Sequence, residues 1–207
     1  MCTTGFPACR VSDNRTMTSL STPRIAEEEY LRLERAAETK SELIHGEIVA
    51  RPGGSLERVM LAARWSAELG LKLRGRDLML FDSQLRIRTP DSGSYVCPDA
   101  SVVRGQPQTH QSADEILTNP TAVIEVLSPS SEDYRWAKTF ELYREIASLQ
   151  DYILVHTGSI HVEHFSRQPG SWLFREYHGA ESSVTIASIG CTVLLGDVYD
   201  GIPGLPG

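Results

Sequence analysis

Two acidic residues of this chain stand inside apolar segments. Glu125 lies in the run 121–127 (TAVIEVL), and Asp99 lies in the segment 95–103 (YVCPDASVV). Burying an unpaired carboxylate costs several kcal/mol or forces its protonation, so a buried acid usually meets a cation or a hydrogen-bond network. The two segments therefore predict a shared metal-binding edge.

Glu42 is the third acid that we place at this edge. Hard divalent cations such as Mg²⁺ prefer carboxylate oxygens, and a bound ion can polarise a phosphate and activate the attacking water. Pro98 removes a backbone donor and interrupts regular strand pairing, which lets Asp99 point into a site. An alternative stays open, because a Pro-Asp pair often forms a turn and a glutamate at a strand end often pairs with an arginine or caps the next helix.

Cationic partners for these acids are Lys40, Arg135 and Lys138. Arg135 and Lys138 are three residues apart in the helix expected after Glu125, so they share one helix face. Their alternative role is a solvated helix surface.

Other catalytic arrangements find less support. His156, His161 and His164 look like a cluster, but 161 and 164 differ by an odd number and so lie on opposite faces of a strand, which argues against a zinc site there. Ser128 and Ser130 have no evident His and Asp partners. Neither GxxxxGK[ST] nor GxGxxG occurs, which argues against nucleotide-binding loops.

The elements that must position the acids follow from hydrophobic periodicity and turn residues. We expect a helix after Thr22-Pro23, a hairpin over 42–49 around His45-Gly46, and a helix from Ser55 to near Gly75. Strands are expected over 78–88, 95–103, 121–127 and 151–155, a helix from Ser130 or Ser131 to about Ile146, and edge-type strands near 160–166, 172–177 and 184–189. Residues 104–119 read as a polar loop with a short helix near 114–117. The order predicts an α/β (α+β) fold with a central mixed sheet flanked by helices and additional C-terminal strands.

Length and composition limit the remaining choices. The chain has 207 residues, with 20 Lys+Arg and 27 Asp+Glu for a net charge of −7, which argues against coating nucleic acid by bulk charge but allows a local basic groove. Cys2, Cys9, Cys97 and Cys191 form no CxxC pair, as expected of reduced thiols in a cytoplasmic protein. No long apolar run predicts a membrane span. We expect a disordered extension over 1–21 (with Met17 as an alternative start), one domain over 22–197, and a Pro/Gly-rich tail over 198–207.

Over residues 22–197 the chain resembles the Uma-two-type putative restriction endonuclease domain, a branch of the PD-(D/E)XK nuclease superfamily. The resemblance is carried by EEYL (28–31), SELIHGE (41–47), LRIR (85–88), YVCPD (95–99), IEVLSPSS (124–131), FELYR (140–144) and DYILV (151–155). It implies a restriction-endonuclease-like fold, with Asp99 and Glu125 as the metal-binding acids and Glu42 as an additional one. It also implies Mg²⁺ or Mn²⁺ as the cofactor and DNA as the substrate.

The sequence departs from the family pattern at the catalytic lysine. The usual position, two residues beyond the glutamate, is Leu127, and in this branch the lysine lies in the next helix, in a stretch like Asp-Arg-Gly-x-Lys-Phe. Here 135–140 reads RWAKTF, so Thr139 stands at the lysine position and Lys138 one residue earlier. One helical residue turns a side chain by about 100°, yet Lys138 is the catalytic lysine that we assign. A second departure is Arg58, where the family commonly has His.

Three hypotheses follow. The first is a metal-dependent DNA endonuclease using Asp99, Glu125 and Lys138, and the second is a catalytically inactive nuclease-like module that binds DNA or a protein partner. The third is a structural or assembly protein without a nucleic-acid role. A homodimer would match the two-fold symmetry of a duplex.

Overall fold

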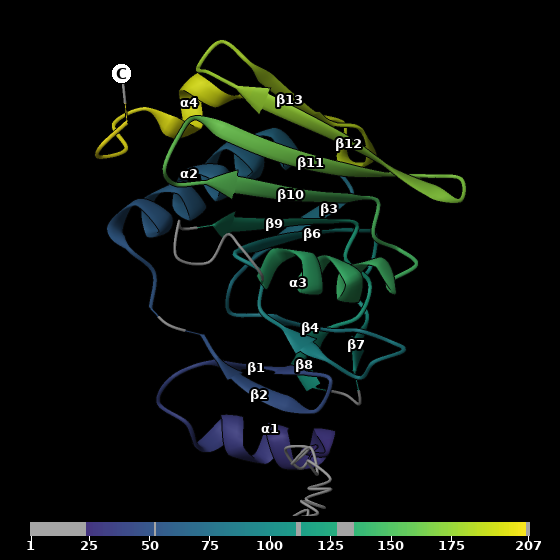
Figure 1. Cartoon of the computed structure of the whole chain (residues 1–207). Coiled ribbons are helices and arrows are strands. Elements are labelled where there is room, and N and C mark those ends of the chain that lie inside the picture. The colour runs from purple at the N-terminus through teal and green to yellow at the C-terminus, as the bar shows by residue number, and fades with distance from the viewer. Residues whose placement is uncertain (1–23, 52, 111–112, 128–134, 206–207) are drawn as a thin grey trace, which may run out of the picture.

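The computed structural model describes residues 24–51, 53–110, 113–127 and 135–205, and over these the chain forms two six-stranded sheets and a small two-stranded one (Figure 1). The central sheet has the order β12-β11-β10-β9-β6-β3. Its strands are β3 (Leu78–Asp82), β6 (Ala100–Arg104), β9 (Ala122–Leu127), β10 (Asp151–His156), β11 (His161–Gln168) and β12 (Ser171–His178). β9 and β10 run parallel and the other neighbours antiparallel, so the predicted mixed sheet is confirmed.

Helices cover both faces of the central sheet. Side chains of a strand alternate between its faces, and accordingly Ile124 and Val126 of β9 pack with α2 (Leu56–Leu73), whereas Val123 and Leu127 pack with α3 (Arg135–Arg144). Burial on both faces explains why β9 and β10 read as almost continuous apolar runs. Ser55 begins α2 as predicted, because its side chain accepts a hydrogen bond from the Arg58 N–H.

The second sheet has the order β2-β1-β5-β4-β8-β7 and packs against α1 (Glu27–Ala36). Its strands are β1 (Ser41–Ile44), β2 (Glu47–Ala50), β4 (Arg86–Arg88), β5 (Tyr95–Val96), β7 (Thr109–His110) and β8 (Ala113–Leu117). The predicted hairpin is confirmed: His45 and Gly46 have φ of 50° and 84° in the turn that joins β1 to β2.

Two expected strands are each divided between the sheets. The segment 78–88 forms β3 and β4, because the Asp82 side chain accepts from the Gln84 N–H and closes a turn between them. The segment 95–103 forms β5 and β6, interrupted at Pro98, which has no N–H to donate. Both interruptions carry the chain from one six-stranded sheet to the other.

The predicted short helix near 114–117 is wrong, since this segment is strand β8. β8 pairs in parallel with β4, where Arg86 lies opposite Ile116 and Ile87 opposite Leu117, and Ile116 and Leu117 are buried. Pairing with β4 and burial in the core favour a strand here, and they outweigh the local preference of these residues for a helix.

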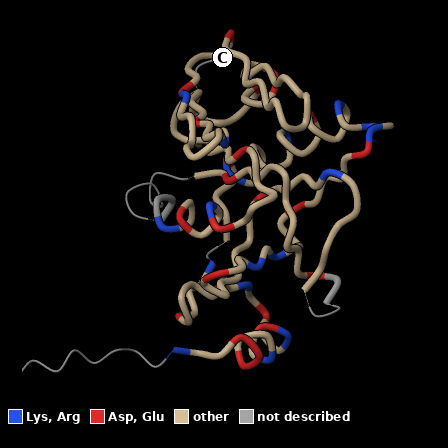
Figure 2. The backbone as a smooth tube through the Cα atoms, turned by 90° about the vertical axis from the view of Figure 1, so that its right-hand side faces the viewer, with Lys and Arg blue, Asp and Glu red and all other residues tan. Residues whose placement is uncertain are grey.

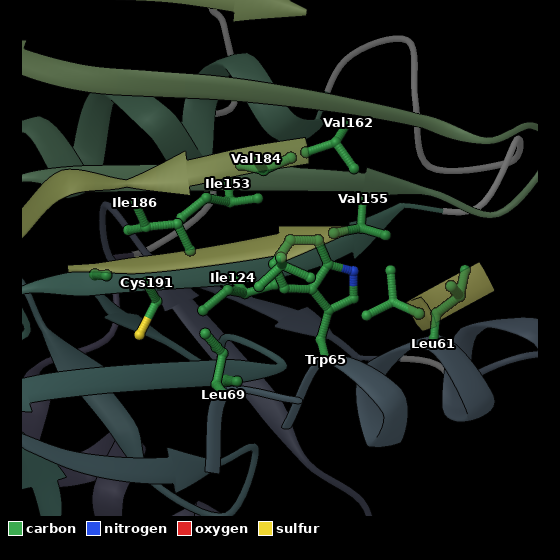
Figure 3. Packing of buried hydrophobic residues seen from close by; sticks show 14 of the residues in the cluster. Leu61, Trp65, Leu69, Ile124, Ile153, Val155, Val162, Val184, Ile186 and Cys191 are labelled. Atoms are coloured by element: carbon green, nitrogen blue, oxygen red, sulfur yellow. The ribbon is translucent and has the colours of Figure 1, made fainter. Parts of the chain in front are cut away.

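The C-terminal elements close the core on the α2 side. They are β13 (Ser183–Ile186), a 3-10 turn (Ala187–Ile189), β14 (Cys191–Leu194) and α4 (Leu195–Tyr199). The strand expected to reach residue 189 thus ends at Ile186. Val184 and Ile186 pack into one cluster with Trp65 of α2 (Figure 3), and Ile202 beyond α4 is buried in it too.

Some expectations fall outside the described residues: the extension 1–21, Thr22, Cys2, Cys9, Ser128, and a helix cap at Ser130 or Ser131. Cys97 and Cys191 are buried free thiols. Among the described helices, none is long and apolar enough to cross a membrane.

Candidate functional site

The three predicted acids come from three separate strand regions and converge. Glu42 belongs to β1, Asp99 lies in the link from β5 to β6, and Glu125 belongs to β9. Glu42 and Asp99 are buried, while Glu125 keeps partial solvent access. The β5–β6 link joins the two six-stranded sheets and so places Asp99 between Glu42 of one sheet and Glu125 of the other.

Arg51 lies among these carboxylates. Its Nη2 donates to Asp99 Oδ1 at 2.8 Å, and its Nη1 lies 3.5 Å from Glu42 Oε1. Burial opposes the positive charge of Arg51, but the three carboxylates outweigh that effect and raise its pKa. Arg51 Nη1 is buried and makes no hydrogen bond of good geometry. The acids therefore attract the charge of the guanidinium but leave one of its N–H groups without a good acceptor.

Asp99 is held by several hydrogen bonds. Arg58 Nη2 lies 3.0 Å from each of its two oxygens, and the Val126 N–H donates to Oδ2 at 2.8 Å. The Asp99 N–H in turn donates to the Ile124 carbonyl, which fixes the residue against β9. Asp99 therefore points into the cluster, as the interruption at Pro98 predicted.

Glu125 faces α3. The Tyr143 hydroxyl donates to its Oε1 at 2.9 Å. Burial raises the pKa of Glu125 to about 7; Arg51 opposes this rise, and the neighbouring Asp99 and Glu42 add to it. Near neutral pH this carboxyl can therefore hold a proton and release it when a cation approaches.

A pocket of about 540 Å³ opens beside Asp99. Its wall contains three cationic side chains, Lys40, Arg51 and Arg58, together with Asp82 and residues at the start of α2. Lys40 is held there by the Ser83 carbonyl, to which its Nζ donates at 2.7 Å. Basic and acidic positions are interleaved along the described chain (Figure 2), so this basic wall is a local feature.

α3 presents residues 138 and 139 differently. Lys138 is exposed, whereas Thr139 is buried one helical turn before Tyr143, the residue that contacts Glu125. Positions four apart share a helix face, so position 139 lies on the face of α3 that meets the acids. The side chain of Arg135 lies outside the described residues.

The donor set fits a hard divalent ion. Three carboxylates supply the oxygen ligands that Mg²⁺ and Mn²⁺ prefer. Arg51 and Arg58 together carry two positive charges, the same charge as one divalent ion, which shows how much positive charge the acids attract.

Sequence reasoning missed Arg51 and Tyr143. The hairpin register contained a signal for Arg51. The turn at 45–46 pairs Glu42 with Val49, so Arg51 lies two residues beyond the partner of Glu42. Its N–H donates to the Lys40 carbonyl, which continues the same pairing. Tyr143 could not be found in this way, since its contact with Glu125 depends on how α3 packs.

Three comparisons relate the chain to known proteins. The model of the Uma2 family, described as "Putative restriction endonuclease", matches residues 27–193. Two uncharacterized proteins of Synechocystis sp. (strain PCC 6803) are similar: slr1290 at 34% identity, covering 87% of this chain and 94% of its own length, and sll1609 at 32%, covering 81% and 96%. A crystal structure from Anabaena variabilis ATCC 29413, titled a putative nuclease belonging to DUF820, shares the fold with a TM-score of 0.69 and 20% identity, over 84% of this chain and 97% of that one. With this restriction-endonuclease-like fold and a family match over most of its length, the chain belongs to the Uma2 family of putative restriction endonucleases.

Proposed function

We propose that this chain is a divalent-metal-dependent DNA endonuclease that hydrolyses phosphodiester bonds. The observation that carries the proposal is the convergence of Glu42, Asp99 and Glu125 on one buried cation, Arg51, beside a pocket with a basic wall. Family membership supports a nuclease, and the donor set supports Mg²⁺ or Mn²⁺ at these acids. When bound, such an ion polarises the phosphate and lowers the pKa of its water.

Each side chain has a role that follows from its position. Glu42, Asp99 and Glu125 would hold the metal ion, and Glu125 would lose, on metal binding, the proton that it carries near neutral pH in the metal-free protein. Lys40 and Arg58 attract the DNA phosphates into the pocket. Arg51 cannot act as a base because guanidinium stays protonated, so it stabilises negative charge that grows at the phosphate. Lys138, exposed on α3, contributes its charge from the solvent side.

The test is nicking of supercoiled plasmid with Mg²⁺ or Mn²⁺. Asp99→Ala should reduce the rate by about 100-fold or more, the scale expected when a preorganised electrostatic group is removed. The control Asp200→Ala changes an exposed acid after α4 and should leave the rate unchanged. Equal rates in Asp99→Ala and the unmodified protein would exclude the proposed site.

A second function, a nuclease-like module that binds DNA or a protein partner without cleaving, is favoured by one observation. Both oxygens of Asp99 are already bonded to Arg58, and Arg51 adds a further bond. Arg58→Ala separates the two functions. In an enzyme, this change makes Asp99 available and increases Mg²⁺ affinity; in a binding module, it only weakens salt-dependent DNA binding, measured by fluorescence anisotropy.

A homodimer would offer one such centre to each strand of a duplex. Sedimentation of the protein with and without DNA measures this directly. A monomer that nicks single strands is the alternative result.

A further inference from the structure

A second group of metal-binding side chains lies on the strands at the other end of the central sheet. We call it the histidine cluster: His156 at the end of β10, His161 and Glu163 on β11, and Glu176 and His178 on β12. The β11–β12 register pairs His161 with His178 and Glu163 with Glu176. Residues two apart on a strand share a face, so these four side chains stand on one face of the sheet.

The ligand atoms of this cluster are already close together. They form two trios that share His161, one with His156 and Glu163 and one with Glu176 and His178, and within each trio the atoms lie within 4.8 Å of one another. His156 Nε2 is 3.0 Å from Glu163 Oε1, and His161 Nε2 is 3.2 Å from Glu176 Oε1. The His161 ring stacks between the other two, with centroids 4.2 and 4.3 Å away.

Glu176 satisfies His161 Nε2 incompletely, although it lies close to it. This atom is buried and makes no hydrogen bond of good geometry. Buried polar atoms in native proteins nearly always have a partner, and an ion is one explanation for an exception.

The backbone beneath the cluster is fixed. The buried Tyr199 hydroxyl, from α4, lies 2.8 Å from the carbonyl oxygens of both His156 and His161. It joins the end of β10 to the start of β11 from the opposite side of the core. The imidazoles are thus presented from rigid strands, which reduces the cost of ordering them around an ion.

The cluster is separate from the acids of the proposed nuclease centre. Glu125 pairs with Leu154, and Leu154 pairs with Glu163, so two strand spacings, about 10 Å, separate the two glutamates on the same face. His164, which the sequence grouped with His156 and His161, lies on the other face and pairs with Asp151 at 2.6 Å. The odd spacing correctly put His161 and His164 on opposite faces, but it was used against any zinc site here, before Glu163, Glu176 and His178 were considered.

We propose that His156, His161 and Glu163 bind one imidazole-preferring divalent ion, Zn²⁺ in the first place, with Glu176 and His178 of the second trio as further ligands within reach. Two histidines and one glutamate are a known Zn²⁺ ligand set that leaves a coordination position open. We choose this trio over the one with Glu176 and His178 because its members are more enclosed. The proposal does not depend on DNA cleavage.

The test is Zn²⁺ binding to the metal-free full chain by equilibrium dialysis, together with the visible spectrum of the Co²⁺ complex. We expect one equivalent of Zn²⁺ in the unmodified protein, and also in Asp99→Ala, which disables the acid cluster. His161→Gln should weaken Zn²⁺ binding by at least about tenfold, since even indirect partners of a metal contribute 10- to 100-fold. His178→Gln should weaken it less.

The matched control is His45→Asn, which removes an exposed imidazole from the β1–β2 turn and should leave Zn²⁺ binding unchanged. Should His161→Gln fail to fold, judged by circular dichroism, Glu163→Gln tests the same trio. Absence of Zn²⁺ binding at micromolar concentration in the unmodified protein overturns the proposal. So does an unchanged affinity and Co²⁺ spectrum in the folded His161→Gln or Glu163→Gln variant.

Discussion

Glu125 shows how the surroundings of one residue set its chemistry. It is placed in an otherwise apolar strand, and burial raises its pKa to about 7 from an ordinary value of 4.5. One cationic neighbour, Arg51, and one hydrogen-bond donor, Tyr143, oppose this rise without abolishing it. The carboxyl is therefore set to exchange a proton for a cation near neutral pH.

This shift predicts a pH dependence of stability in the absence of divalent ions. Between about pH 4.5 and 7 the folded protein binds more protons at Glu125 than the unfolded chain does. The contribution of this carboxyl to stability is therefore complete below pH 4.5 and is lost as the pH rises through 7. Glu125→Gln removes this loss. As the pH rises from 5 to 8, the free energy of unfolding of the variant should therefore increase relative to that of the unmodified protein, by on the order of 1–3 kcal/mol.

Urea unfolding in the presence of a chelator measures both curves. The exposed Glu181→Gln change, on the loop before β13, serves as the control and should leave the pH curve of the unmodified protein unchanged. Parallel curves for Glu125→Gln and the unmodified protein would mean that this carboxyl titrates as it does in the unfolded chain.

At the scale of elements, α3 decides which side chain can serve as the lysine of the site. Thr139 lies on the buried face with Tyr143, and Lys138 is exposed. Thr139→Lys should place an amine toward Glu125 and increase metal-dependent nicking by about 100-fold, the lower end of what a positioned proton donor or acceptor contributes.

Lys138→Ala is the matched change on the neighbouring position. It should lower nicking by less than about fivefold, since an exposed charge contributes up to about 1 kcal/mol. Rates in a plasmid assay, with circular dichroism to confirm folding, compare the two. A larger loss in Lys138→Ala than the gain in Thr139→Lys would assign the catalytic amine to position 138.

The elements also show what could be derived from the sequence. The hairpin at 45–46, the cap at Ser55 and the buried strands around Glu125 and Tyr152 were predictable, because each depends on local turn chemistry or on an uninterrupted apolar run. The division of 78–88 and 95–103 between two sheets was not, since each pair of short strands reads as one strand until its partners are known. The contact of Tyr143 with Glu125 depends on packing between distant elements and leaves no local signal. The pairing of His161 with His178 depends on the register of the β11–β12 hairpin, which the expected strand ranges did not specify.

On the scale of the whole molecule, the proposed nuclease centre depends on the relative position of two sheets. Glu42 belongs to the sheet beside α1, Glu125 to the central sheet, and Asp99 to the link between them (Figure 1). Arg58 comes from α2, which the main core holds against the central sheet. A substitution that weakens the packing of this core should therefore change the geometry of the site, although the substituted residue does not belong to it.

Trp65 is the residue that tests this dependence. It is fully buried in the cluster that joins α2, the central sheet and the C-terminal elements (Figure 3), and its indole N–H has no hydrogen-bond partner. Trp65→Ala should lower the free energy of unfolding by about 3–5 kcal/mol, through lost burial and the cavity left behind. Because Trp65 lies two helical turns from Arg58, nicking should also weaken below the unfolding transition.

Trp172→Ala provides the comparison. This indole lies on the edge strand β12, partly exposed, under the Arg167 guanidinium at 4.4 Å. Its loss should lower stability clearly less than the loss of Trp65, because the side chain is partly exposed and lies on the edge strand, against Phe140 of α3. Denaturant unfolding followed by circular dichroism gives both free energies, and equal losses would show that the core around α2 does not carry the stability of the molecule.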